Sequence, residues 1–151
     1  MSESVQTNWT GKWHGSIEAY PEGEAGHGWN VTLEIGEYPT IADMCTVWRS
    51  VFTENGTIRA VKDYRFCRGC GIDDLYIDEG ANVTIAAQWI KDVLVSPFKY
   101  KGVFALSSMR IRGDILEEEI YITEDNPAVD NVVVSVKAQS IHLMRMKRMN
   151  T

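Results

Sequence analysis

The sequence holds few cysteines and few prolines, with three Cys and four Pro among 151 residues. Three cysteines are too few, and odd in number, for the disulfide framework of a small secreted scaffold. A chain of this length buries enough apolar surface to fold without cross-links. We therefore expect one domain over residues 1–151, with residues 1–10 as an N-terminal arm and apolar side chains as the main source of stability.

The chain also lacks long hydrophobic runs and an excess of basic residues. No segment approaches the roughly 18 apolar residues that a membrane-spanning helix needs, so we expect no membrane span. The formal net charge is −6, whereas nucleic-acid-binding proteins usually present a basic stripe, so we expect no nucleic-acid partner. Residues 1–6 carry neither the basic nor the apolar region of a signal peptide. The expected location is the cytoplasm.

What the sequence does contain is a period-two alternation of apolar and polar residues, the pattern of half-buried strands. The run from Trp13 to Ala19 alternates in this way, and Asn55-Gly56 and Gly113-Asp114 are two-residue hairpin signals. We expect strands at residues 12–19, 29–35, 43–53, 57–67, 75–77, 83–89, 103–112, 115–123 and 132–146. The composition of Ala86 to Val95 also allows a short helix there.

Many short strands joined by short turns favour an all-β fold. Sequential hairpins favour an antiparallel up-and-down β-barrel of about eight to ten strands. Closure of such a barrel also removes exposed sheet edges. A jelly roll or another β-sandwich is the alternative architecture.

The segment from Asn8 to Gly15, with Gly11-Lys12-Trp13 inside it, resembles the Gly-x-Trp start of the first strand in the calycin superfamily. That superfamily includes lipocalins and their small intracellular relatives. The resemblance implies a lipocalin-like barrel whose closed end is plugged by the Trp. It also implies that a basic residue of the last strand, Arg145 or else Arg148 here, packs across the Trp ring in a cation–π contact.

The hairpin at Gly113-Asp114 predicts which side chains face the interior. If these two residues form the loop, Met109 lies opposite Glu118, and both share an apolar face with Ser107. A carboxylate in an apolar lining has a raised pKa and is suited to hold a ligand or to act as an acid or base. We therefore expect Ser107, Met109 and Glu118 to contact a ligand. The alternative is a Glu118 that lies in water at the barrel mouth.

Further candidates come from strands with polar residues on both faces. On the fourth expected strand, either Lys62 with Tyr64 or Asp63 with Arg65 would enter a polar part of the cavity. Arg49, on the preceding strand, is a third candidate for contact with the ligand. A solvated sheet edge is the alternative explanation for this two-sided polarity.

His142 and Trp89 are the last two candidates for contact with a ligand. His142, on the last expected strand, would ligate haem or move a proton if it points inward. A satisfied core or rim histidine is the alternative. Trp89 occupies an inward position, where it would contact a ligand or fill the core.

The segment Cys67-Arg68-Gly69-Cys70 has the spacing of half a zinc site or of a redox pair. A structural zinc site needs four ligands, and Cys45 is the one remaining cysteine. The redox motif belongs between a strand and a helix of an α/β fold. We therefore interpret these residues as turn cysteines, and we expect neither a metal nor a cofactor.

The leading functional hypothesis is a binding module that holds a small hydrophobic molecule inside the barrel. Five Trp, six Tyr and six Met would supply its apolar surface. The alternative is an enzyme on the same scaffold, a cyclase, isomerase or lyase acting on a secondary metabolite or pigment. Glu118, Tyr64 and His142 are then the catalytic candidates. A haem-binding barrel is a third hypothesis, and the oligomeric state is open, with a homodimer as one option.

Overall fold

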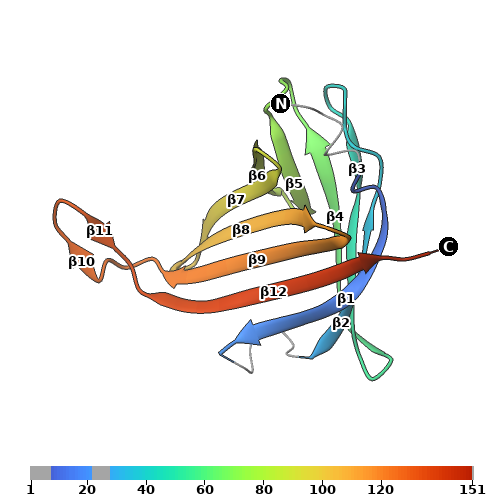
Figure 1. Ribbon diagram of the computed structural model, residues 1–151. Helices are drawn as coiled ribbons and strands as arrows, with labels where there is room; N and C mark the ends of the chain where they lie inside the picture. Colours follow the sequence, from blue (N-terminus) through green and yellow to red (C-terminus); the bar gives the residue numbers. More distant parts are fainter. Residues whose placement is uncertain (1–7, 22–27, 151) are drawn as a thin grey trace.

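The computed structural model describes residues 8–21 and 28–150, and throughout these ranges the chain forms strands and turns without a helix. Ten strands close into an antiparallel barrel, and a separate two-stranded hairpin projects from it (Figure 1). The barrel strands are β1 (Gly11–Tyr20), β2 (Trp29–Ile35), β3 (Cys45–Glu54), β4 (Thr57–Arg68), β5 (Leu75–Gly80), β6 (Val83–Ile90), β7 (Val93–Tyr100), β8 (Val103–Arg112), β9 (Ile115–Glu124) and β12 (Ala138–Arg148). The hairpin consists of β10 (Val129–Asp130) and β11 (Val134–Ser135).

The strand order confirms the predicted all-β up-and-down barrel. From β1 to β9 each strand pairs with its neighbour in the chain, and β12 closes the barrel by pairing with both β9 and β1. Both predicted hairpin signals form tight turns. Asn55 and Gly56 have φ angles of 51° and 79°, the positive values that a type I′ turn requires at both central residues.

The alternative of a short helix at Ala86 to Val95 is wrong. This segment contains the end of β6, a turn, and the start of β7, with Gln88 paired to Val95. Lys91 in the turn has a φ of 58°, which is incompatible with a helix. Burial alternates along β6, where Ala87 and Trp89 are buried and their neighbours are exposed, so period-two packing overrides the helical composition.

The prediction of one long strand over residues 132–146 is also wrong in its first third. The valine-rich part forms the β10–β11 hairpin, whose tip exposes Val132 and Val133 (Figure 1). Strand β12 begins only at Ala138, and its register with β9 shifts between Ala138 and Ser140. The β propensity of the valines is therefore satisfied locally, outside the barrel.

The end of the barrel where β1 begins and β12 ends is closed by Trp13, which is 2% exposed. The guanidinium carbon of Arg148 lies 4.3 Å from the centre of the Trp13 ring. The same guanidinium donates hydrogen bonds to the backbone oxygens of Asn8 and Thr10, and Trp13 Nε1 donates to the Trp9 oxygen at 2.9 Å. This is the contact that the calycin resemblance implies.

Of the two basic residues considered for this contact, Arg148 makes it and Arg145 does not. Arg148 follows Met144 and Met146, both buried, at two-residue intervals along β12. Arg145 is on the opposite face, where its Nε lies 3.3 Å from Glu117 Oε1. The period-two alternation of a strand therefore decides between them.

A second layer of aromatic side chains supports this plug. The rings of Trp9 and Trp89 meet edge to face at 5.1 Å, and Trp89 Nε1 donates a hydrogen bond to the Tyr38 hydroxyl at 3.2 Å. Arg68, which is 4% exposed, also donates to that hydroxyl, at 3.1 Å, and to the Pro39 oxygen at 2.8 Å. Trp89 thus belongs to the closed end of the barrel.

The interpretation of Cys67 as an incidental turn cysteine is wrong, because Cys67 forms a disulfide with Cys45 across β3 and β4. A bulge between Phe52 and Thr53 shifts the register by one residue and places the two cysteines opposite each other. Cys70 is free and exposed. Disulfides persist mainly in oxidising compartments, so this pair weighs against the expected cytoplasmic location.

Candidate functional site

Inside the barrel lies a cavity with two adjoining lobes of about 160 and 150 Å³, which we call lobe A and lobe B. Both are predominantly apolar and share five lining residues, Phe52, Lys62, Glu118, Ile120 and Met144. Lobe A is further lined by Leu33, Trp48, Ser50, Tyr64, Ile77, Glu79, Ile85, Leu94, Ser96, Phe98, Ser107 and Met109. Lobe B is further lined by Ile17, Trp29, Ala60 and His142.

The cavity is built from the inward-facing residues of the strands. Alternate positions of β3 and β4, for example, contribute Ser50 and Phe52, and Ala60, Lys62 and Tyr64. Trp9, Trp13 and Trp89 of the plug line neither lobe, whereas Trp48 borders lobe A and Trp29 borders lobe B. The fold therefore separates a packed part at the plugged end from a hollow part.

Glu118 occupies the junction of the two lobes, deep in the barrel interior. Strand β9 holds it between Met109 on β8, the predicted partner, and Met144 on β12. Ser107 Oγ donates a hydrogen bond to Glu118 Oε2 at 3.1 Å. Burial raises the pKa of Glu118 above its ordinary value, and the Ser107 hydrogen bond and the charge of Lys62 offset part of that rise.

Three further ionisable groups face the same cavity from β4 and β5. The pKa of Tyr64 is raised by burial and then by the charges of Glu79 and Glu118. Burial also raises the pKa of Glu79, against the opposing influence of Lys62. The Lys62 ammonium lies 5.5 Å from the centre of the Phe52 ring, at the boundary between the lobes. These groups can bind polar parts of a ligand or exchange protons with it.

Most of the side chains expected to contact a ligand line this cavity. They are Lys62, Tyr64, Ser107, Met109, Glu118 and His142. His142 lines lobe B and Tyr64 lines lobe A, so these two catalytic candidates border different lobes. Glu118 borders both lobes.

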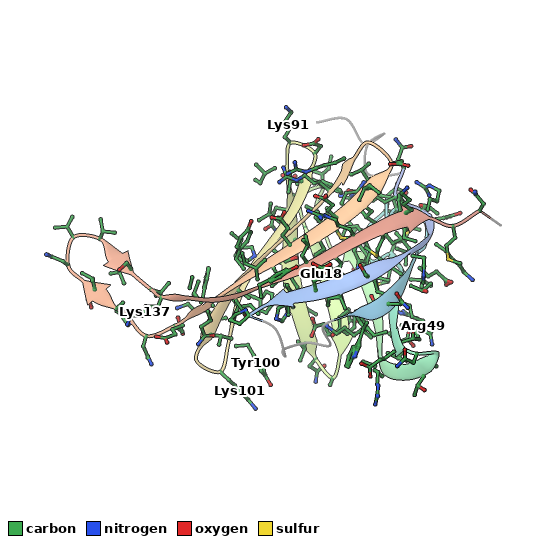
Figure 2. All side chains as sticks on the ribbon, turned by 60° about the horizontal axis from the view of Figure 1, so that its bottom comes forward. Glu18, Arg49, Lys91, Tyr100, Lys101 and Lys137 are labelled. Carbon is green, nitrogen blue, oxygen red and sulfur yellow. A yellow bond between two sulfur atoms is a disulfide. The ribbon has the colours of Figure 1, made fainter. Side chains whose placement is uncertain are left out.

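Arg49 and Trp89 are not among the side chains that line the two lobes. Arg49 projects from the outer surface of the barrel (Figure 2), where its Nε lies 3.9 Å from Asp63 Oδ1. Asp63 and Arg65 are exposed too, so of the two alternatives for β4, the pair Lys62 and Tyr64 faces inward. Trp89 packs in the plug described above. Arg49 pairs with Asp63 because both occupy outward positions in the register of β3 and β4.

Sequence reasoning missed Glu79, the second carboxylate of the cavity. The expected strand ends at residue 77, but β5 continues to Gly80. Glu79 consequently shares the inward face of Leu75 and Ile77. The spacing of Leu75, Ile77 and Glu79 was the available signal. Ser50 and Ser96, buried polar residues of lobe A, were also missed.

We predict that Glu118→Gln stabilises the protein at neutral pH. The pKa of Glu118 is raised in the folded state, so its contribution to stability is complete below its ordinary value of 4.5 and is lost as the pH rises through the folded-state pKa. The Gln variant does not ionise and escapes this loss. Thermal unfolding from pH 4 to pH 8 should show a melting-temperature advantage for Glu118→Gln that grows with pH.

Glu119→Gln is the matched control, because Glu119 lies next to Glu118 on β9 but accepts a hydrogen bond from the exposed Tyr121. An equal effect of the two substitutions would show that the buried carboxylate is not the cause.

Comparison with known proteins gives no relative: no family model matches the chain, and neither a curated protein nor a solved structure matches it. Within residues 8–21 and 28–150, no group of three or more His, Cys, Asp or Glu side chains is arranged to hold a metal ion. The same described ranges contain no helix with the length and hydrophobicity to cross a bilayer.

Proposed function

We propose that this protein binds a small hydrophobic molecule in lobes A and B. The observation that carries the proposal is the hollow interior: Trp9, Trp13 and Trp89 pack at one end of the barrel, and two predominantly apolar lobes remain beside them. A cavity lined mainly by apolar groups, with a few polar groups directed into it, is the usual form of a small-molecule site.

We also propose that the barrel is of the calycin type. The contact between Trp13 and Arg148 supports this assignment, because it joins the two ends of the chain as the resemblance implies. In such barrels the plugged end gives stability and the open end gives access. Fold alone does not identify the ligand, so the proposal needs a direct binding experiment.

The test is native mass spectrometry of the freshly purified protein, before and after denaturing extraction. We expect an adduct of small organic mass that denaturation releases. If the protein is isolated without an adduct, the neutral dye Nile red should bind with a blue-shifted emission. A protein that carries no adduct and leaves the dye emission unchanged would contradict the proposal.

An enzyme on the same scaffold is the second candidate function. Glu118 favours it, because a carboxylic acid at the junction of two apolar lobes, with a raised pKa, is suited to general acid–base chemistry. Conversion of the released compound to a different compound on incubation with the protein, detected by chromatographic retention as well as by mass, would support a cyclase, isomerase or lyase over a binding protein.

A further inference from the structure

We propose that the ligand is a hydrophobic amine, in which two apolar groups, each about the size of one ring, flank a protonated nitrogen that lies against Glu118. This inference rests on the proposed function. It goes further by assigning the shape and the charge of the ligand.

The shape follows from the two lobes. A cavity of about 150 Å³ lined by apolar side chains binds benzene, and lobes A and B have volumes of about 160 and 150 Å³. The two lobes are adjacent, because five side chains border both of them. A molecule with two ring-sized parts and a short connection fills this space better than one compact or one long linear group.

The charge follows from the ionisable groups of the lining. Two of them are acidic, Glu79 and Glu118, and Lys62 is the one lysine, with Tyr64 and His142 as the remaining ionisable groups of the lobes. Among the described residues, neither carboxylate forms an ion pair, and Lys62 is exposed. A ligand carboxylate would add a third negative charge to a cavity with one lysine. A ligand cation would instead balance the second carboxylate.

Glu118 is the group best placed to receive that cation. A carboxylate has about four acceptor positions, and Ser107 occupies one of them. Met109 and Met144, opposite Glu118 on the neighbouring strands, offer no strong donor. An ammonium group at the junction would donate to the remaining positions in a charge-assisted hydrogen bond.

Two further features favour a hydrophobic amine. Phe52 and Ile120 border both lobes, so apolar surface is available at the junction for the carbon atoms that flank the nitrogen. The net charge of the chain is −6, and a negative molecule attracts cations during diffusional encounter.

The test uses two nearly isosteric compounds, N-benzyl-2-phenylethylamine and benzyl 2-phenylethyl ether, in isothermal titration calorimetry at pH 7.5. The amine is protonated at this pH and the ether is neutral. We expect the amine to bind at least about tenfold more tightly, which corresponds to roughly 1.4 kcal/mol. Glu118→Gln should remove this preference, and Glu119→Gln should keep it.

A second measurement follows the same ratio from pH 8 to pH 5. The titratable groups that face Glu118 are Lys62 and Tyr64 on β4, Glu79 on β5 and His142 on β12. Protonation of Glu118 removes the partner of the ammonium, so the preference for the amine should shrink as the pH falls. In Glu118→Gln the ratio should change clearly less with pH, because only the other groups of the lining then titrate.

The outcomes separate the two proposals. An ether that binds as tightly as the amine, or a preference that survives in Glu118→Gln, overturns the amine inference and leaves hydrophobic binding intact. If neither compound binds and Nile red is not taken up, the proposed function fails, and the inference fails with it.

Discussion

Ala60→Phe is expected to weaken the binding of two-ring ligands about a hundredfold while making the protein more stable. Ala60 lies on β4 and lines lobe B. The added ring would occupy a space of about 150 Å³, which is the size of cavity that accepts benzene. Since a ligand would then lose the burial of one ring, worth roughly 2–3 kcal/mol, its affinity should fall about a hundredfold.

The opposite signs of the two effects make this experiment specific. A substitution that damages the fold lowers both binding and stability, whereas a side chain that fills a cavity gains apolar burial. Val61→Phe is the matched control, because Val61 follows Ala60 on the same strand and is 45% exposed. Calorimetry for affinity and urea unfolding for stability are the measurements. Unchanged affinity in Ala60→Phe would show that ligands do not use lobe B.

The register of β8 and β9 could be predicted from the sequence because a two-residue turn fixes it. Gly113-Asp114 places Met109 opposite Glu118, and alternation then sets the inward face. The same reasoning predicts from the sequence that Glu118 and Ser107 share the inward face, and both line lobe A. Where turn and alternation agree, the inward face is predictable to the residue.

A β-bulge shifts the register, so the pairing beyond a bulge cannot be predicted from the turn alone. Counting back from Asn55-Gly56 without a bulge places Cys45 opposite Phe66, and the shift at Phe52 and Thr53 moves it opposite Cys67. Nothing in the local sequence marks that shift. The disulfide was therefore not predictable from spacing, although the two cysteines are of the right types and lie on adjacent strands.

The volume of the cavity is a second property that the sequence does not contain. An aromatic residue at an inward position gives the same alternation pattern whether it fills the barrel or lines a cavity. Trp13 and Trp89 pack in the plug, whereas Trp29 borders lobe B. The difference depends on how far each residue lies from the closed end, and this distance is set by the tilt and stagger of all the strands together.

Trp13→Ala is expected to cost about 3–5 kcal/mol of unfolding free energy, the range typical of a buried Trp replaced by Ala. Trp13 is 2% exposed, stacks under Arg148 and donates a hydrogen bond to the Trp9 backbone. The substitution leaves a cavity, removes the cation–π contact and leaves a backbone oxygen without its donor. For a domain whose stability is roughly 5–15 kcal/mol, urea unfolding should show a large shift of the midpoint.

Trp29→Ala provides the comparison, because Trp29 is half-buried and lines the hollow part of the barrel. Its loss should cost clearly less stability than the loss of Trp13, since its ring already faces a cavity. Its effect on ligand affinity should be the larger of the two, because Trp29 lines lobe B and Trp13 lines neither lobe. Equal stability losses would mean that the plug is not the dominant source of stability. If Trp13→Ala mainly lowers stability and Trp29→Ala mainly lowers affinity, stability and binding depend on different parts of one barrel.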